Sequence, residues 1–218
     1  MYNLVMKDLK LGINPLFFLV PVVLGALMLI PGWLYFIVLL YFCWITVPNT
    51  FGQFRSQNDL MFTSMMPVTK TDMVKARVLV IVILEMLHML MAIIFGIINI
   101  RLYGEIHNVF FGPYPGFWGL CFVMFAVFNV FFIPMFYKTA YKFGGAALAG
   151  ITGAMVFAGL AQWIGIQNSY VSNMFNGSGV HNVALQASLM IAGIVIFIAL
   201  TVIAYRIAVK RFHKVEIQ

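Results

Sequence analysis

Six long runs of apolar residues constrain the fold of this chain more than any other feature. They cover residues 13–30, 33–54, 76–100, 117–137, 143–165 and 184–208. Each can cross a hydrocarbon core of about 30 Å, because about 20 helical residues span that thickness. The chain is 63% hydrophobic and 9% charged, with a mean hydropathy of +1.01. No run alternates as a strand does, so we predict one all-α integral membrane domain, residues 1–218, with six transmembrane helices.

The basic residues indicate the orientation, because they fall in alternate connections between the runs. Twelve of the thirteen lie on one side: Lys7, Lys10, Arg55, Lys70, Lys75, Arg77, Lys138, Lys142, Arg206, Lys210, Arg211 and Lys214. Arg101 lies on the other, where Glu105 can partner it. The positive-inside rule predicts cytoplasmic termini and a cytoplasmic 55–77 segment, with 103–116 and 166–183 outside. The net charge of +7 then reflects topology and contact with membrane lipid rather than nucleic-acid binding.

The first twelve residues alternate apolar and polar side chains, a pattern that fits a short helix lying in the membrane interface. A cleavable signal peptide is the competing interpretation. Asp8 is unsuited to a positive n-region, and no small-x-small site follows the first run. We therefore expect residues 1–12 to form an interfacial helix. Further on, Pro31-Gly32 predicts a tight turn between the first two spans.

Residues 55–77 form the only long hydrophilic insert in the first half of the chain. Ser56 and Asp59 have capping-box spacing and predict a short helix from Gln57 to Met66, ended by Pro67. Thr69 and Asp72 form a second capping-box pattern, which predicts the start of the third span.

The short helix at 56–66 carries more apolar side chains than one membrane-facing side requires. They are Leu60, Met61, Phe62, Met65 and Met66. We expect some of them to contact another protein.

The fifth run opens with small residues four apart, such as Gly145–Ala149 and Ala149–Gly153, which predict close helix approach. The stretch is rich in glycine but lacks the G-x-x-x-x-G-K-[ST] pattern of a phosphate-binding loop. Residues 166–183 contain no Asp, Glu, Lys or Arg and are predicted to form an external loop. In it, Asn176-Gly177-Ser178 matches both a turn and a glycosylation sequon, and we favour the turn.

Glu85 is the one acidic residue inside a span, about 15 Å deep in the third run. A carboxylate at that depth is costly, so Glu85 should face the bundle or a wet cavity and have a partner. His88 lies one turn further on the same face. Both residues are candidates either for helix packing or for translocation.

No pattern in the sequence predicts an enzyme, so we expect no catalytic residues. The four histidines lie in separate segments, and neither H-E-x-x-H, a pair of intramembrane aspartates nor G-x-S-x-G is present. We expect no metal site and no cofactor in this chain. Cys43 and Cys121 are interpreted as small apolar packing residues.

The insert resembles the conserved stretch of small bacterial ABC-2-type permeases. The similar residues run from Asp59 to Lys70 through Met65-Met66-Pro67-Val68-Thr69, followed by Asp72-Met73-Val74 and Ala76-Arg77. The whole plan is also similar, with an interfacial N-terminal helix, six spans, a cytoplasmic insert after the second span and a longer external loop before the last.

The resemblance implies a permease subunit in a bacterial plasma membrane. Its partners would be two copies of an ABC ATPase subunit, which carry ATP and Mg, and a second permease, identical or homologous. The insert would be the coupling helix, with Ser56, Asp59, Leu60, Phe62 and Met65 binding the ATPase. Similarity to phenol-soluble-modulin and antimicrobial-peptide exporter permeases implies export of an amphipathic peptide or lipid-like cargo.

Two other classes of function stay open. A proton-coupled secondary transporter would use Glu85, but the six runs show no detectable repeat. A membrane assembly protein that transports nothing is the other. A neighbouring reading frame with the G-x-x-x-x-G-K-[ST] pattern would favour the ABC prediction.

Overall fold

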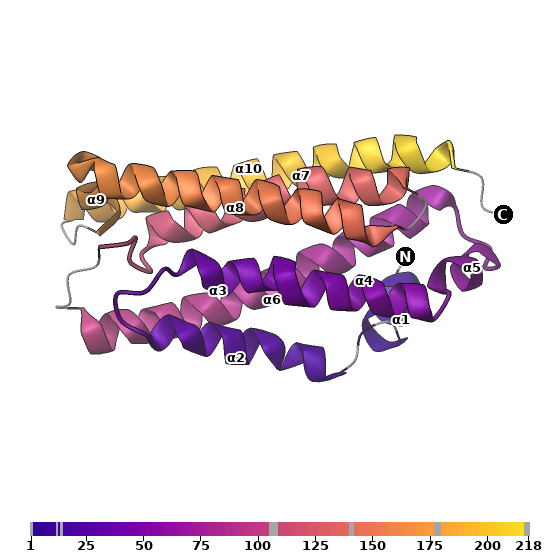
Figure 1. Cartoon of the computed structure of the whole chain (residues 1–218), viewed down its shortest axis with the longest axis horizontal. Helices are drawn as coiled ribbons and strands as arrows, with labels where there is room; N and C mark the ends of the chain where they lie inside the picture. The colour runs from indigo at the N-terminus through magenta and orange to yellow at the C-terminus, as the bar shows by residue number, and fades with distance from the viewer. Residues whose placement is uncertain are drawn as a thin grey trace.

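Long apolar runs in this chain form long helices. A computed structural model describes residues 2–11, 13, 15–104, 109–139, 142–176 and 180–215, and every regular element within them is helical. The elements are α1 (Tyr2–Leu11), η1 (Pro15–Phe18), α2 (Val20–Ala26), η2 (Leu27–Leu29), α3 (Phe36–Tyr41), η3 (Phe42–Thr46), α4 (Val47–Ser56), α5 (Asp59–Ser64), α6 (Lys70–Tyr103), α7 (Pro115–Lys138), α8 (Phe143–Gln167), α9 (Ser169–Asn176) and α10 (Val180–His213). They form an elongated bundle (Figure 1).

Five segments in the described part of the chain are long and apolar enough to cross a membrane. They are Phe36–Ser56, Lys70–Tyr103, Pro115–Lys138, Phe143–Gln167 and Asn182–His213. The span predicted at 13–30 is shorter and broken: η1, α2 and η2 together run only from Pro15 to Leu29, about 22 Å of helix. A sixth span is counted only if this segment is joined to α1, to which it lies at 100°. The structure thus supports five spans, and six only on that condition.

Two proline positions fit the helices around them. Pro31-Gly32 makes the predicted turn, with Gly32 at φ +69°, a conformation that glycine adopts without strain. The Tyr35 hydroxyl donates to the Ile30 carbonyl across this turn at 3.0 Å. Pro48 stands in the first turn of α4, directly after the π-helical segment η3. The wider turn of a π-helix accommodates the missing proline N–H, so the second span stays continuous.

Small residues set the closest approaches between helices. A Cβ atom on Gly193 of α10 would lie 2.2 Å from the backbone oxygen of Gly119 in α7, so only glycines allow this crossing. Gly150 of α8 faces Phe128 of α7, which would lie 2.9 Å from an added Cβ. The close approach predicted from the small residues of the fifth run is therefore confirmed.

The two ends of the bundle differ. α1, α5 and the last turns of α10 lie at one end, and α9 lies at the other (Figure 1). The stretch predicted as an external loop contains a helix, because Ser169–Asn176 forms the eight-residue helix α9. The expected Arg101–Glu105 pair and the Asn176-Gly177-Ser178 turn involve residues outside the described ones.

Candidate functional site

Helix α5 is shorter than predicted and begins differently. It covers six residues, Asp59–Ser64, and its N-cap is Asn58, which has a left-handed backbone at φ 48°. Ser56 still belongs to α4, and its hydroxyl donates to the Gln53 carbonyl at 2.9 Å. The predicted capping box of Ser56 and Asp59 is therefore wrong. Asn58 tolerates the left-handed conformation better than most residues and lets the chain turn between α4 and α5.

The side chains of α5 divide between the bundle and the surface. Leu60 is half-buried and packs against the hydrophobic core, and Thr63 is buried. Met61, Phe62 and Met65 are 60%, 56% and 72% exposed. We call these three side chains the contact face. Leu60 is therefore not part of the contact face, although the sequence analysis expected it to bind the ATPase together with Phe62 and Met65.

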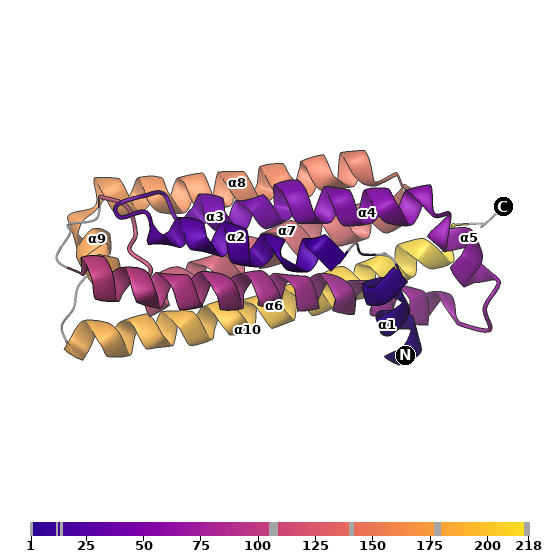
Figure 2. The ribbon, with the colours of Figure 1, turned by 90° about the horizontal axis from the view of Figure 1, so that it is seen from below.

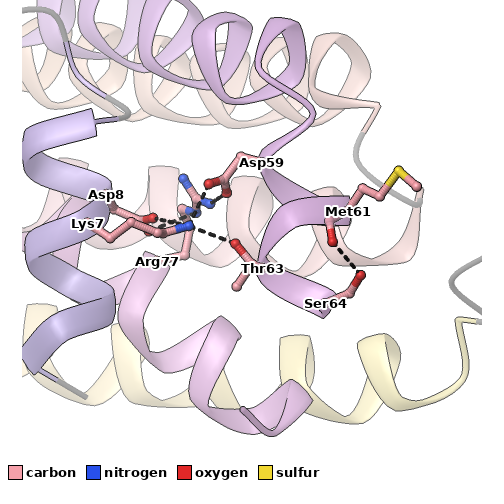
Figure 3. Close-up of polar contacts among 7 residues, drawn as sticks. All are labelled: Lys7, Asp8, Asp59, Met61, Thr63, Ser64 and Arg77. Atoms are coloured by element: carbon pink, nitrogen blue, oxygen red, sulfur yellow. Dashed lines mark hydrogen bonds and ion pairs between the residues drawn. The ribbon is translucent and has the colours of Figure 1, made fainter. Parts of the chain in front are cut away.

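Lys7 of α1 holds the inner side of α5. Its ammonium donates to Asp59 Oδ1 at 2.5 Å and to Thr63 Oγ1 at 2.7 Å (Figure 3). It also lies 3.1 Å from Asp8 Oδ1 and 5.9 Å from the centre of the Phe62 ring. Because Asp59 and Thr63 are four residues apart, they present their oxygens on one face of α5.

Arg77 of α6 completes this group of charges. Its Nη2 bonds to Asp59 Oδ2, and its Nε lies 3.4 Å from Asp8 Oδ2. The guanidinium also stacks on Phe54 of α4, 3.4 Å from the ring centre. We call Lys7, Asp8, Asp59 and Arg77 the charged clasp. Two acids and two bases in mutual contact join α1, α5 and α6.

The clasp is nearly dry. Its side chains are 4–11% exposed, and the free space beside them is about 10 Å³, roughly room for one water. Burial raises the pKa of Asp59, but Arg77 and Lys7 lower it further, so the pKa lies below the ordinary 3.8. Asp59 is therefore ionised at neutral pH. Its carboxylate is engaged inside the chain, and the predicted contact of Asp59 with an ATPase stays a prediction.

The link from α5 to α6 follows the sequence pattern. Thr69 is the N-cap of α6, and its Oγ1 accepts the backbone N–H of Asp72 at 3.1 Å. The same hydroxyl donates to Asp72 Oδ2 at 2.6 Å. The helix start predicted from Thr69 and Asp72 is confirmed. Arg77 therefore lies in the second turn of α6, a short way along the chain from α5.

The second candidate site lies in the middle of the bundle. Glu85 of α6 is fully buried, and its Oε2 accepts from Asn129 Nδ2 of α7 at 3.1 Å. The same amide nitrogen lies 3.3 Å from Thr201 Oγ1 of α10. We call Glu85, Asn129 and Thr201 the central network. The prediction that Glu85 faces the bundle and has a partner is confirmed.

His88 has different partners. Its Nε2 lies 3.2 Å from Thr46 Oγ1, its Nδ1 lies 2.8 Å from the Leu84 carbonyl, and its ring packs edge-on against Phe42. Among the described hydrogen bonds, none joins His88 to Glu85. The two residues therefore tie α6 to different neighbours, Glu85 to α7 and His88 to η3.

Sequence reasoning did not assign three of the four clasp residues to a site. Lys7 and Arg77 entered the prediction as topology charges, Arg77 also as part of the resemblance, and Asp8 only as an argument against a signal peptide. One signal was available: Lys7 and Asp8 are adjacent in a short interfacial helix, and Arg77 falls inside an apolar run where a lone cation is costly. Nothing local indicated that the three meet Asp59.

Comparisons with known proteins give one finding. A family model described as ABC-2 family transporter protein matches residues 3–213. Neither the comparison with curated proteins nor that with solved structures gave a match.

Proposed function

This chain belongs to the ABC-2 family of transporter permeases, and from that premise we propose that it is the membrane subunit of an ATP-driven exporter. The family is a transmembrane permease family that associates in general with an ABC ATPase. The proposed assembly has two copies of a separate ATPase subunit, which carry ATP and Mg, and a second permease, identical or homologous to this one.

The observation that carries the proposal is the contact face of α5. Three large, flexible or aromatic side chains stand exposed at the end of the bundle, Met61 and Phe62 on the six-residue helix α5 and Met65 at its C-cap. Methionine and phenylalanine adapt well to a groove on a partner protein. Exposed apolar groups of this size at a protein end typically mark an interaction surface. We assign this surface to the ATPase and α5 to the role of coupling helix.

The clasp supplies a route for transmitting force. Asp59 is bound from α1 by Lys7 and from α6 by Arg77, so a push on α5 reaches both helices through charged contacts. Buried pairs of this kind hold their geometry because separating them leaves unpaired charges in a dry site. In the proposed mechanism, closure of the ATPase pair moves α5, α1 and the first turns of α6 together.

The cargo we propose is an amphipathic peptide or a lipid-like molecule leaving the cell. The support is the sequence resemblance to permeases that export such peptides. Glu85 and His88 are the candidates for a translocation role, with helix packing as the competing role.

Phe62→Ala tests the coupling assignment. The permease should be co-purified with its proposed ABC ATPase subunit, and ATP hydrolysis should be measured in liposomes. We expect Phe62→Ala to reduce recovery of the ATPase or to uncouple hydrolysis from export, while the permease itself inserts normally. Met65→Ala should also reduce recovery of the ATPase or uncouple hydrolysis. Unlike Phe62→Ala, it does not remove the ring that lies beside Lys7.

Phe131→Ala is the matched control, because Phe131 is 50% exposed on α7, away from α5. An unchanged complex with normal transport in the Phe62→Ala and Met65→Ala variants would refute the assignment.

The proposed orientation places α5 and both termini in the bacterial cytoplasm and α9 outside. Twelve of thirteen basic residues support it. Cysteines introduced at Ser64 and at Ser169, both exposed, should react with a membrane-impermeant maleimide from opposite sides of the membrane. Native Cys43 and Cys121 are buried, which keeps the background low. Labelling of both positions from one side would overturn the orientation.

A further inference from the structure

An apolar groove lies between α6 and α10. The two helices contact each other, and their ribbons cross in the view of Figure 2. The groove has a volume of about 420 Å³, within the range of sites that hold small ligands. Its floor consists of buried side chains, Val78, Phe197 and Thr201. Leu79, Ile198 and Val202 form partly exposed walls.

Two cations stand at one end of this groove. Lys75 comes from the second turn of α6 and Arg206 from near the end of α10, and both are exposed. Neither forms a salt bridge with any described residue. Asp72, the nearest described acid along α6, has its carboxylate bound by the Thr69 hydroxyl. The groove therefore combines an apolar interior with a positively charged mouth.

The dimensions fit one leaflet of a bilayer. From Lys75 to Val82 along α6 is about 10 Å, and from Arg206 to Phe197 along α10 is about 14 Å. Half of a hydrocarbon core of about 30 Å is about 15 Å. A chain lying in the groove with its head at the cations would thus end near the bilayer midplane.

We propose that this groove binds one anionic phospholipid of the surrounding membrane, with an acyl chain between α6 and α10 and the phosphate on Lys75 and Arg206. Two cations that form no salt bridge with any described residue favour a lipid with net negative charge over a zwitterionic one, whose own cation they would repel. A second copy of this chain fits the groove poorly. Twofold pairing about the membrane normal would bring the Lys75 and Arg206 of both copies together, and like charges oppose that contact.

The floor of the groove packs against α7 and joins the central network. Phe197 packs on Phe122 of α7 with ring centres 5.7 Å apart. Thr201 lines the groove while its Oγ1 receives the amide of Asn129. A bound acyl chain would therefore contact Thr201. Thr201 is hydrogen-bonded to Asn129, and Asn129 in turn contacts Glu85.

The test is native mass spectrometry of the detergent-purified full chain with added phosphatidylglycerol or phosphatidylcholine. We expect one phosphatidylglycerol bound per chain, in preference to phosphatidylcholine. Lys75→Gln with Arg206→Gln should weaken its binding by roughly 30-fold, about fivefold for each cation. Arg55→Gln with Lys138→Gln removes the same charge from exposed positions elsewhere and should leave binding unchanged.

Two further measurements locate the acyl chain. Val202→Phe keeps both cations but narrows the groove, and it should also weaken binding. Phosphatidylglycerol with a photoreactive diazirine on its acyl chain should label peptides containing Val78–Val82 and Phe197–Val202. Equal binding of both lipids, equal loss in the control pair, labelling spread over all helices, or a peptide cargo or second copy crosslinked in the groove would each overturn the proposal. Lipid binding is measured without the ATPase, so it does not depend on the proposed exporter function.

Discussion

The charged clasp and the central network both place acids inside the bundle, but they stabilise them by opposite means. In the clasp, Asp8 and Asp59 each lie within 4 Å of both Lys7 and Arg77, so two acids face two bases in a buried group. In the central network, Glu85 contacts the neutral amide of Asn129, and no described cation forms a salt bridge with it. One site pairs acids with cations, and the other pairs an acid with uncharged polar groups.

Position along α6 explains the difference. The helix is 34 residues long, about 51 Å, which exceeds a hydrocarbon core of about 30 Å. Arg77 lies about 10 Å from its start, near the membrane interface, whereas Glu85 lies near its middle. Ions are tolerated near the interface when they are paired, but at the midplane even paired ions are costly. The charged clasp, which is suited to transmit movement, thus lies near the interface, and the central network, which is suited to hold helices together, lies near the midplane.

The largest expected effect comes from Arg77→Leu. Removing the guanidinium leaves Asp8 and Asp59 with only Lys7, in a site with room for about one water. Breaking one side of a buried pair typically costs about 3–5 kcal/mol. We expect a lower unfolding temperature in detergent and faster proteolytic cleavage between α4 and α6.

Two variants sharpen that result. Arg55→Leu removes an exposed arginine from the end of α4 and should change stability by less than about 1 kcal/mol. Arg77→Leu combined with Asp59→Asn should recover part of the loss, because it removes the unpaired carboxylate. If Arg77→Leu behaves as Arg55→Leu does, the clasp contributes no stability.

Acid should loosen the clasp next. The pKa of Asp59 in the folded chain lies below the ordinary 3.8, so the folded state holds fewer protons than the unfolded state in this range. The stabilisation is complete above the ordinary value and is lost as pH falls through the lower folded pKa. The unfolding temperature in detergent should therefore fall only under strongly acidic conditions. Asp59→Asn should remove that loss of stability. Burial raises the pKa of Asp8 above the ordinary 3.8, and a raised carboxyl pKa favours the folded state as pH falls, so Asp8 does not cause the loss. A loss near neutral pH would contradict the assignment.

Asn129→Ala should have a smaller effect on the central network. The variant removes the amide donor that Glu85 and Thr201 share. Hydrogen bonds between helices in membranes average about 0.6 kcal/mol and reach about 1.7, so we expect a loss of about 1 kcal/mol. Reversible unfolding in mixed micelles measures it. A loss as large as that of Arg77→Leu would show that Glu85 is charged and depends on this amide.

Glu85→Gln should change stability least, by less than about 0.5 kcal/mol, because glutamine keeps the shape and can still accept from Asn129. The informative readout is function. If the variant assembles with the ATPase and hydrolyses ATP but does not export, Glu85 has a cargo or gating role. Failure to assemble would support a packing role. Normal behaviour in both assays would show that its charge is dispensable.

Much of the fold could be predicted from sequence because its signals are local. Runs of about 20 apolar residues stabilise a membrane helix wherever they occur, so five of the predicted runs overlap helices long enough to cross a membrane, with ends that differ by up to six residues. The start of α6 was predicted for the same reason, since Thr69 and Asp72 interact across three residues. The burial of Glu85 followed from the cost of an exposed carboxylate in lipid. Neither its partner nor the separate role of His88 could be inferred that way.

The sequence by itself determined the all-helical membrane fold, the basic end of the bundle and the position of the insert. Only the tertiary structure decided which side chains of α5 face outward, because a helix of six residues is too short for its periodicity to define a face. It also decided the clasp, since Lys7 and Asp59 are 52 residues apart in sequence. Charges pair wherever packing brings their helices together, and packing depends on glycine contacts such as Gly119 with Gly193 that no local pattern reveals.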